Sequence, residues 1–197
     1  ARLIRQAGID FASLEESEAD SPLGGYTGAG TIFGATGGVM EAAVRSAYYF
    51  VTKEELGNIE LTPVRGLDNI KTCEIDVAGK KLKLAVVHQL GNVDAVVQEV
   101  LEAKREGKEP PYHFIEVMAC RGGCVSGGGQ PYGSNDEIRA KRAAGLYQDD
   151  KNSEIRVSHK NPDIITLYNE YLKEPCGEKS HHLLHTHYTE RELYNYQ

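Results

Sequence analysis

The sequence predicts an α/β domain in which a small β-sheet is flanked by helices. Short runs rich in β-branched residues alternate with longer segments whose apolar residues recur at helical spacing. In addition, the turn-forming pair Ala78-Gly79 separates two of the short runs and indicates a β-hairpin. Strands that alternate with helices are typical of α/β domains, in which helices cover the faces of the sheet.

Four segments are predicted to be strands. Residues 71–77 and 80–88 form the two arms of the hairpin. Residues 113–119 form an apolar strand that runs directly into Cys120, and residues 61–64 form a short additional strand. The sheet is therefore expected to end beside a cysteine.

The predicted helices begin at capping residues, whose side chains satisfy free backbone N–H groups. Thr36 caps a helix to about residue 52, Asn92 caps one to about 105, and Asn161, followed by Pro162, caps one to about 172. Because the first of these follows a glycine-rich loop, its free N–H groups would suit an anion or a cluster ligand.

Three further helices and two loops are predicted from the remaining sequence. A helix is predicted over 2–7, another from 136 to about 147 after Ser134 or Asn135, and a short polar one over 190–194. Residues 21–30 are rich in turn formers and are predicted to lack regular structure. Asp149 and Asp150 are predicted to lie in a solvated loop over 149–152.

Composition excludes several classes of protein. The net charge of −7 argues against nucleic acid or an anionic membrane as the main partner. No apolar run in the sequence approaches the roughly 20 residues of a membrane span. Four cysteines in 197 residues are too few for a secreted disulfide scaffold, so we predict a reducing, cytoplasmic location.

The stretch from Glu116 to Pro131 contains the most informative chemistry. Cys120 and Cys124 are separated by Arg121-Gly122-Gly123 and are followed by three consecutive glycines. Structural zinc sites favour C-x2-C spacing and four ligands, and a catalytic cysteine would need a histidine nearby. An iron–sulfur cluster fits better, because glycines let backbone N–H groups point at sulfur. On spacing alone, a pair of free cysteines in a tight turn remains the alternative.

Three segments resemble one family in the order in which they occur there. M-A-C-R-G-G-C-V-S-G-G-G-Q-P (residues 118–131) resembles the last signature of the catalytic domain of iron-only (FeFe) hydrogenases. F-G-A-T-G-G-V-M-E-A-A-V-R (residues 33–45) resembles a loop and helix that line the active-site cluster of that family. Residues 161–172 and 178–188 resemble its C-terminal segment, which wraps the domain and is a separate small subunit in some members.

The resemblance implies a hydrogenase that interconverts two protons and two electrons with dihydrogen at an H-cluster. That cofactor is a 4Fe–4S cubane joined through one cysteine sulfur to a di-iron unit with CO, cyanide and dithiolate ligands. By the resemblance, Cys120 is a cubane ligand and Cys124 is the bridging ligand, which gives it the central catalytic role. Met118 would pack against the di-iron unit and contribute to catalysis. The pocket wall would be formed by Phe33, Gly34 and Val39.

The sequence departs from the family pattern in three places. Arg121 stands where a proline is most often expected, and its positive charge would suit an anionic cluster. Two earlier signatures, T-S-C-C-P and M-P-C-x-x-K, are absent, and with them two cubane cysteines, the proton-delivering cysteine and a lysine. The missing half would either precede Ala1 or be supplied by another chain, and because Ala1 opens within a helical pattern, we expect it to precede Ala1.

The organisation and partners follow from the same resemblance. Residues 1–157 would form the C-terminal lobe of the catalytic domain, and residues 158–197 a wrapping segment like the small subunit. The partners implied are the rest of the catalytic subunit and an electron-transfer partner, either ferredoxin or an NAD(P)- or formate-linked subunit.

Two alternative functions remain open. Hydrogenase-like iron–sulfur assembly proteins also carry a C-x3-C pair but make no hydrogen, and a hydrogen-sensing relative would share the site. Pro131, the helix start at Thr36 and the L-L-H-T tail favour the enzyme over the assembly protein. The tail histidines (His181, His182, His185 and His187) could suggest a metal, but we interpret them as packing residues, and we assign no role to Cys73 or Cys176.

Overall fold

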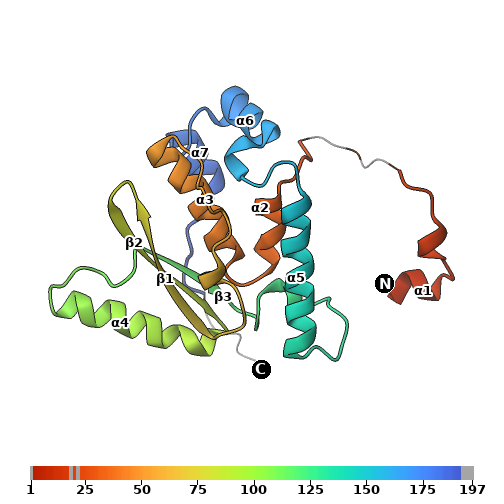
Figure 1. Ribbon diagram of the computed structural model, residues 1–197, viewed down its shortest axis with the longest axis horizontal. Helices are drawn as coiled ribbons and strands as arrows, with labels where there is room; N and C mark the ends of the chain where they lie inside the picture. The colour runs from red at the N-terminus through yellow and green to blue at the C-terminus, as the bar shows by residue number, and fades with distance from the viewer. Residues whose placement is uncertain (1, 18–19, 21–22, 192–197) are drawn as a thin grey trace.

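A three-stranded sheet in the order β1-β2-β3 lies at the centre of the computed structural model, which describes residues 2–17, 20 and 23–191 (Figure 1). Strand β1 (Ile70–Val77) and strand β2 (Lys80–His88) form the predicted antiparallel hairpin. Strand β3 (Phe114–Met118) pairs with β2 in parallel, and helix α4 (Val93–Arg105) makes the crossover between them. The α/β class predicted from the sequence is therefore confirmed.

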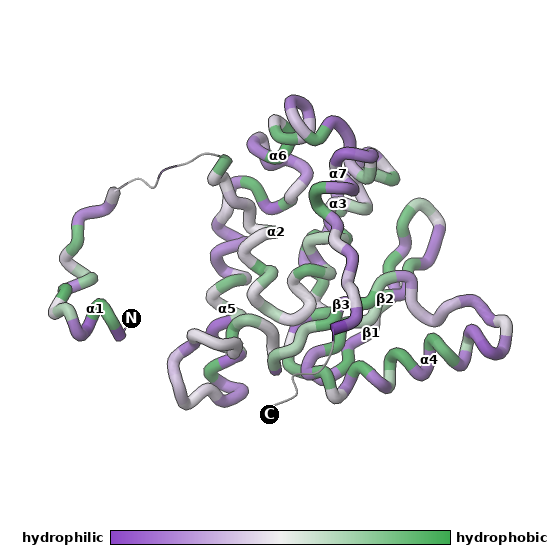
Figure 2. The backbone as a smooth tube through the Cα atoms, turned by 180° about the vertical axis from the view of Figure 1, so that it is seen from behind, coloured by the Kyte–Doolittle hydropathy of each residue, from purple (hydrophilic) through white to green (hydrophobic). Residues whose placement is uncertain are grey.

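The second half of strand β2, residues 84–88, is buried on both faces because a helix covers each side of the sheet (Figure 1). Leu84 and Val86 pack with Met40 and Val44 of helix α3 (Gly38–Thr52). On the opposite face, Ala85 and Val87 pack with Val96 of α4. Figure 2 shows hydrophobic and hydrophilic positions alternating along α4, as expected for a helix with one face on the sheet.

The other helices surround this core. Helix α5 (Asp136–Asn152) packs beside the short helix α2 (Gly28–Thr31), whereas α1 (Arg2–Gln6) stands apart from the sheet (Figure 1). The described residues also contain α6 (Pro162–Leu167), which continues as a π-helical turn (Tyr168–Leu172), and α7 (Glu178–Leu184). Short 3-10 turns cover Phe11–Ser13, Ile32–Gly34, Thr62–Val64, Leu90–Asn92, Cys124–Ser126 and Ser158–Lys160.

Several predictions of local structure are wrong. Asn92 precedes α4, but its side chain makes no capping hydrogen bond to that helix. The segment predicted as a strand over 61–64 is a 3-10 turn with Pro63 in its first turn, where a missing N–H costs nothing. Residues 21–30 were predicted to lack regular structure, but Thr27 caps a helical turn through its hydroxyl. The N-cap of α3 is Gly37 rather than Thr36, because only glycine readily adopts the φ of 91° found there.

The largest difference concerns Asp149 and Asp150, which lie in the last turn of α5 and not in a solvated loop. Asp150 is fully buried and accepts hydrogen bonds from both Nη atoms of Arg45, at 2.8 and 2.9 Å, and from Arg156 at 2.6 Å. Arg45 is itself fully buried and also binds Glu41 at 2.7 Å. This ion network joins α3 to α5 and thereby fixes the two helices that flank the cysteine loop.

Part of the C-terminal segment lies beside α3 (Figures 1 and 2). The ring of His159 stacks on Tyr49 at 4.3 Å between centroids. Asn161 caps α6 as predicted, accepting from the N–H groups of Asp163 and Ile164. The helix predicted over 190–194 falls mostly outside the described residues.

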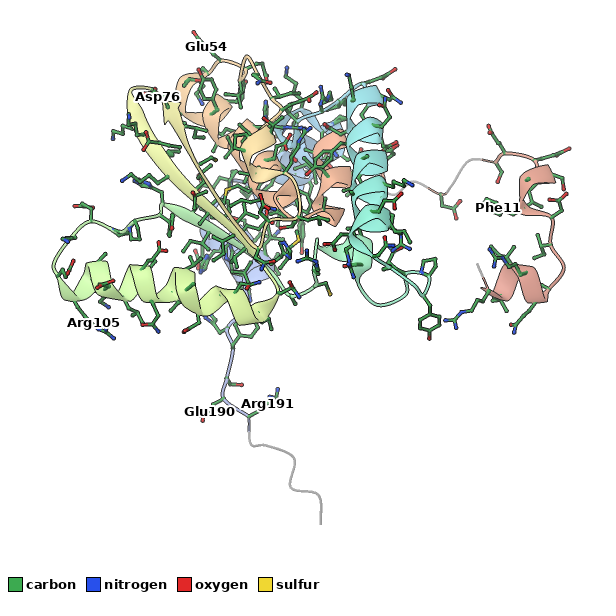
Figure 3. All side chains as sticks on the ribbon, turned by 60° about the horizontal axis from the view of Figure 1, so that its bottom comes forward. Phe11, Glu54, Asp76, Arg105, Glu190 and Arg191 are labelled. Atoms are coloured by element: carbon green, nitrogen blue, oxygen red, sulfur yellow. The ribbon has the colours of Figure 1, made fainter. Side chains whose placement is uncertain are left out.

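Several charged side chains lie at the periphery. Asp76 at the tip of the hairpin and Arg105 at the end of α4 lie at the edge of the molecule, whereas side chains crowd between the sheet and its covering helices (Figure 3). No helix in the described ranges combines the length and apolar character that a membrane crossing requires.

Candidate functional site

The two cysteines lie on an exposed loop directly after β3. Cys120 and Cys124 are both free and exposed, and both line a concavity of about 360 Å³. Its other lining residues are Met118, Ala119, Gly123, Gly127 and Gly128. Strand β3 thus ends at a shallow hollow in which two thiols face open space, an arrangement suited to holding a metal cluster.

Cys124 also lines a second concavity, of about 390 Å³, on the side of α5. This second hollow includes Gly34 from the loop before α3, with Arg142, Gly145 and Leu146 of α5. Cys124 therefore stands between two hollows, whereas Cys120 lines only the first of them within the described chain. The two cysteines have different surroundings, in line with different roles.

Gly123 allows the loop to fold tightly between the cysteines. Its φ of 92° and ψ of −157° lie in a region that essentially only glycine occupies. A Cβ at this position would lie 2.8 Å from Sδ of Met118 and 2.8 Å from the backbone N of Thr36. The backbone of the cysteine loop consequently approaches both predicted pocket segments too closely for any side chain at Gly123.

The neighbouring glycine is held by hydrogen bonds from two other elements. The Gly122 N–H donates to Nδ1 of His88 at 3.1 Å, and the Gly122 carbonyl accepts from the Thr36 N–H at 3.0 Å. His88 is fully buried at the end of β2, and its Nε2 lies 3.3 Å from the Leu67 carbonyl. These contacts imply a neutral imidazole with the proton on Nε2. Burial and the nearby Lys71 charge lower the pKa of His88, which favours that neutral form.

Glu116 of β3 binds the start of α3. Its carboxylate accepts from the Gly37 N–H at 2.6 Å and the Met40 N–H at 2.7 Å. Burial raises the pKa of Glu116, although these hydrogen bonds and the Lys71 charge oppose the shift. The prediction that this helix terminus offers free N–H groups to a ligand is therefore wrong at Gly37 and Met40, because an internal carboxylate already binds them.

Lys71 completes the buried polar group behind the loop. Its Nζ donates to the Gly66 carbonyl at 2.9 Å and to the Thr36 hydroxyl at 3.3 Å. Burial lowers the pKa of Lys71 to about 8, and the charges of Glu116 and Asp68 oppose this effect. Lys71, His88 and Glu116 were not predicted to have a role. Glu116 lies within the apolar run F-I-E-V-M, and a charged residue at such a position indicates a buried carboxylate with a partner.

The predicted site residues come together only in part. Met118, Cys120 and Cys124 share the first concavity, and Gly34 shares the second with Cys124. Phe33 precedes Gly34 and is 45% exposed. Val39 lies in the first turn of α3, and in the described chain it lines neither hollow.

The donor set fits a cluster that draws further ligands from elsewhere. The described residues contain no group of three or more His, Cys, Asp or Glu side chains arranged to hold a metal ion. Cys73 lies on β1 beside the apolar core, and burial raises the pKa of its thiol, which disfavours the ligating thiolate. Cys176 is exposed in the turn before α7. The two loop thiols fit one side of an iron–sulfur cluster, and glycines leave room around them.

Comparison with known proteins identifies the family. Residues 1–128 match the family described as "Iron only hydrogenase large subunit, C-terminal domain". The chain belongs to the iron-only hydrogenase family. Residues 136–191 match a second description, "Iron hydrogenase small subunit", so the two matches meet near the exposed loop between the cysteines and α5.

Individual relatives agree with this assignment. The chain is 46% identical over 193 residues to the NADP-reducing hydrogenase subunit HndD of Solidesulfovibrio fructosivorans, covering 98% of this chain and 32% of that protein. A solved variant of the [FeFe]-hydrogenase HydA1 from Chlamydomonas reinhardtii superposes with a TM-score of 0.69 at 39% identity, covering 95% of this chain and 53% of that one. The chain thus spans about a third to a half of the length of these hydrogenases.

Two relatives have lower identity. Protein NAR1 of Arabidopsis thaliana is 30% identical over 194 residues, which is 94% of this chain and 40% of that protein. The cytosolic iron-sulfur assembly component 3 of Rattus norvegicus is 28% identical over 199 residues, which is 95% of this chain and 39% of that protein.

Replacing Gly123 with alanine should destabilise the protein by about 2–5 kcal/mol, because the new Cβ adds steric overlap to an unfavourable backbone conformation. Gly133→Ala is the matched control, since Gly133 also has a positive φ, 84°, but a Cβ there meets nothing within 4 Å. Urea denaturation of both variants measures the difference. Equal losses of stability in the two would contradict the close approach of Met118 and Thr36 to Gly123.

Proposed function

We propose that this chain is the C-terminal part of the catalytic domain of an FeFe hydrogenase, which interconverts protons and electrons with dihydrogen. The observation that carries the proposal is the pair of exposed thiols on a glycine loop, at the hollow where Met118 also lies. The bound H-cluster would supply the hydrogen chemistry and accept the electrons. The protein would contribute the ligands, their orientation and an environment that tunes the cluster.

In this proposal the residues have separate tasks. Cys120 would ligate the cubane, and Cys124 would ligate both the cubane and the di-iron unit, in keeping with its place between two hollows. Met118 would cover the di-iron unit, with Phe33, Gly34 and Val39 on the loop and helix start that form the wall. His88 and Thr36 would hold Gly122, and with it the backbone between the two ligands.

The remaining ligands and the proton-delivering cysteine would come from the other part of the catalytic subunit, which we propose as the first partner. Electrons would then pass to a ferredoxin or to an NAD(P)- or formate-linked subunit. The similarity to HndD, which is named as an NADP-reducing hydrogenase subunit, supports an NADP-linked partner. The cytoplasmic location stays a prediction from the cysteine content.

The alternative function is that of an iron–sulfur assembly protein without hydrogenase activity, and the similarity to the cytosolic iron-sulfur assembly component 3 of Rattus norvegicus supports it. The identity to HndD, 46%, exceeds the 28% to that assembly component over a similar share of this chain, which favours the hydrogenase. A hydrogen-sensing relative would carry the same cofactor and would differ in turnover.

Infrared spectroscopy separates these functions. The complete subunit that contains this chain, produced with its cluster-assembly proteins, should show CO and cyanide stretching bands together with hydrogen turnover. Iron and labile sulfide without those bands would indicate the assembly protein and overturn the proposal. Bands with very slow turnover would indicate the hydrogen sensor instead.

A further inference from the structure

Arg121, the residue between the two cysteines that departs from the family pattern, is the centre of a contact network. Its Nε and Nη2 bind the two carboxylate oxygens of Asp136 at 2.8 and 2.6 Å. Its Nη1 donates to the side-chain oxygens of Asn69 at 3.0 Å and Gln89 at 3.3 Å. One guanidinium therefore contacts the start of α5, the segment before β1 and the turn after β2.

The groups that Arg121 binds are themselves fixed. Asp136 is the first residue of α5, where a carboxylate is favoured by the free N–H groups of the helix terminus. Gln89 is held by a 2.9 Å hydrogen bond from its N–H to the Met118 carbonyl. The Arg121 carbonyl, in turn, accepts from the Ser126 hydroxyl beyond Cys124. The side chain of Arg121 thus connects the start of the cysteine loop to neighbouring elements, and its carbonyl connects that start to the far end of the same loop.

The charge of Arg121 is already paired. Its hydrogen bonds to Asp136 raise the pKa of the guanidinium, and the same contacts lower the pKa of the carboxyl. The interpretation that Arg121 supplies free positive charge to a cluster is therefore less favoured than a mechanical role. A bidentate arginine–carboxylate pair fixes orientation as well as distance.

A proline and this arginine can both restrict the conformation of the linker between the cysteines, but by different means. Proline stiffens a backbone by fixing φ and lacks an N–H. Among the described residues the Arg121 N–H has no hydrogen-bond acceptor, so this position makes no use of the group that proline lacks. Because the linker also contains Gly122 and Gly123, it would vary in conformation without either a proline or the arginine contacts.

We propose that Arg121 is a positioning residue that fixes the linker between Cys120 and Cys124 by clamping it to Asp136, Asn69 and Gln89. The clamp keeps the two thiols at the spacing that a bound cluster requires. It also joins the segment that matches the hydrogenase large subunit to the segment that matches the small subunit, since Asp136 opens the latter. This inference rests on the proposed function, because it assumes that the cysteines hold a cluster.

The test measures how fast a chelator removes iron from the complete, cluster-loaded subunit. Arg121→Ala should accelerate iron release about tenfold, because partners that orient metal ligands typically affect affinity on that scale. Asp136→Ala should act similarly, and the double variant should release iron no faster than Arg121→Ala alone, since both changes remove one interaction. Arg121→Lys should recover only part of the loss, because lysine cannot bind Asp136 in a bidentate manner.

Arg139→Ala is the matched control, because Arg139 also binds Asp136, at 2.7 Å, but lies on α5 rather than on the linker. It should leave the release rate within about twofold of the parent, because the contacts from Arg121 to Asp136 stay in place and a single side-chain ion pair of this kind contributes little. The inference is overturned if Arg121→Ala releases iron at the parent rate, if Arg139→Ala matches its effect, or if the effects of the two single variants multiply in the double variant. A parent protein that binds no cluster would instead refute the proposed function.

Discussion

Replacing Cys124 with alanine should abolish hydrogen turnover and the CO and cyanide infrared bands of the loaded subunit. The reason is that, in the proposed site, Cys124 is the only protein thiolate of the di-iron unit and also a cubane ligand. Loss of a ligand that serves both parts should reduce activity by at least about a hundredfold. Retention of full turnover would contradict the assignment of Cys124.

Cys120→Ala provides the contrast, because Cys120 is proposed to bind only the cubane. We expect lower iron content and a weakened EPR signal from the reduced cubane. Cys176→Ala is the matched control, since Cys176 is another exposed free cysteine that lies outside the two hollows of the described chain. Iron content, EPR and infrared spectra of the three variants should therefore distinguish three roles. These are a ligand of both the cubane and the di-iron unit, a ligand of the cubane alone, and a cysteine that binds neither.

Replacing Asp150 with alanine should lower the free energy of unfolding by about 3–5 kcal/mol, because it leaves the buried guanidinium of Arg45 without its main counter-charge. Arg45 is fully buried and would lose two hydrogen bonds, while Arg156 would lose a third. The network connects α3 with α5, so the loss should appear in the main cooperative transition. Urea denaturation followed by circular dichroism measures it.

Asp149, the residue before Asp150 in the chain, provides the control for Asp150→Ala. Asp149 is exposed and binds only the Thr31 hydroxyl, at 3.0 Å, among the described side chains, so Asp149→Ala should cost less than about 1 kcal/mol. Similar losses at the two positions would show that burial and ion pairing do not set the effect.

The stabilisation by Asp150 should also depend on pH. Burial opposes ionisation of Asp150, but the hydrogen bonds from Arg45 and Arg156 outweigh it and lower the pKa of its carboxyl. A group whose pKa is lower in the folded than in the unfolded state stabilises the protein at neutral pH. That contribution decreases as the pH falls below the unfolded-state pKa, about 3.9, and toward the lower folded-state value. The difference between parent and Asp150→Ala should therefore shrink in acid.

Sequence patterns were reliable where the relevant interactions are local. The hairpin around Ala78-Gly79, the helix after Asn161 and the strand that leads into Cys120 depend on periodicity, capping and turn residues, which are visible within a few positions. The C-x3-C pair with its glycines is also a local pattern, and it is the basis of the prediction of a cluster loop.

Contacts between side chains that lie far apart in the sequence could not be predicted from local patterns. Asp150 was interpreted as part of a solvated turn because two adjacent aspartates are usually exposed, and its partner Arg45 lies 105 positions away in the chain. The helix start at Gly37 was expected to be open, but Glu116, 79 positions away, binds it. Charged side chains reveal their burial only when the segments that enclose them are placed in space.

The sequence by itself determined the fold class, the two cysteines and their resemblance to a hydrogenase signature, because each depends on residue types at short, fixed spacing. Only the tertiary structure decided how the cysteine loop is held. His88 and Thr36 fix Gly122, and Arg121 binds Asp136, because folding brings the end of β2, the start of α3 and the start of α5 to one place. The candidate ligands were therefore proposed from the sequence, whereas the groups that would position them emerged only from the structure.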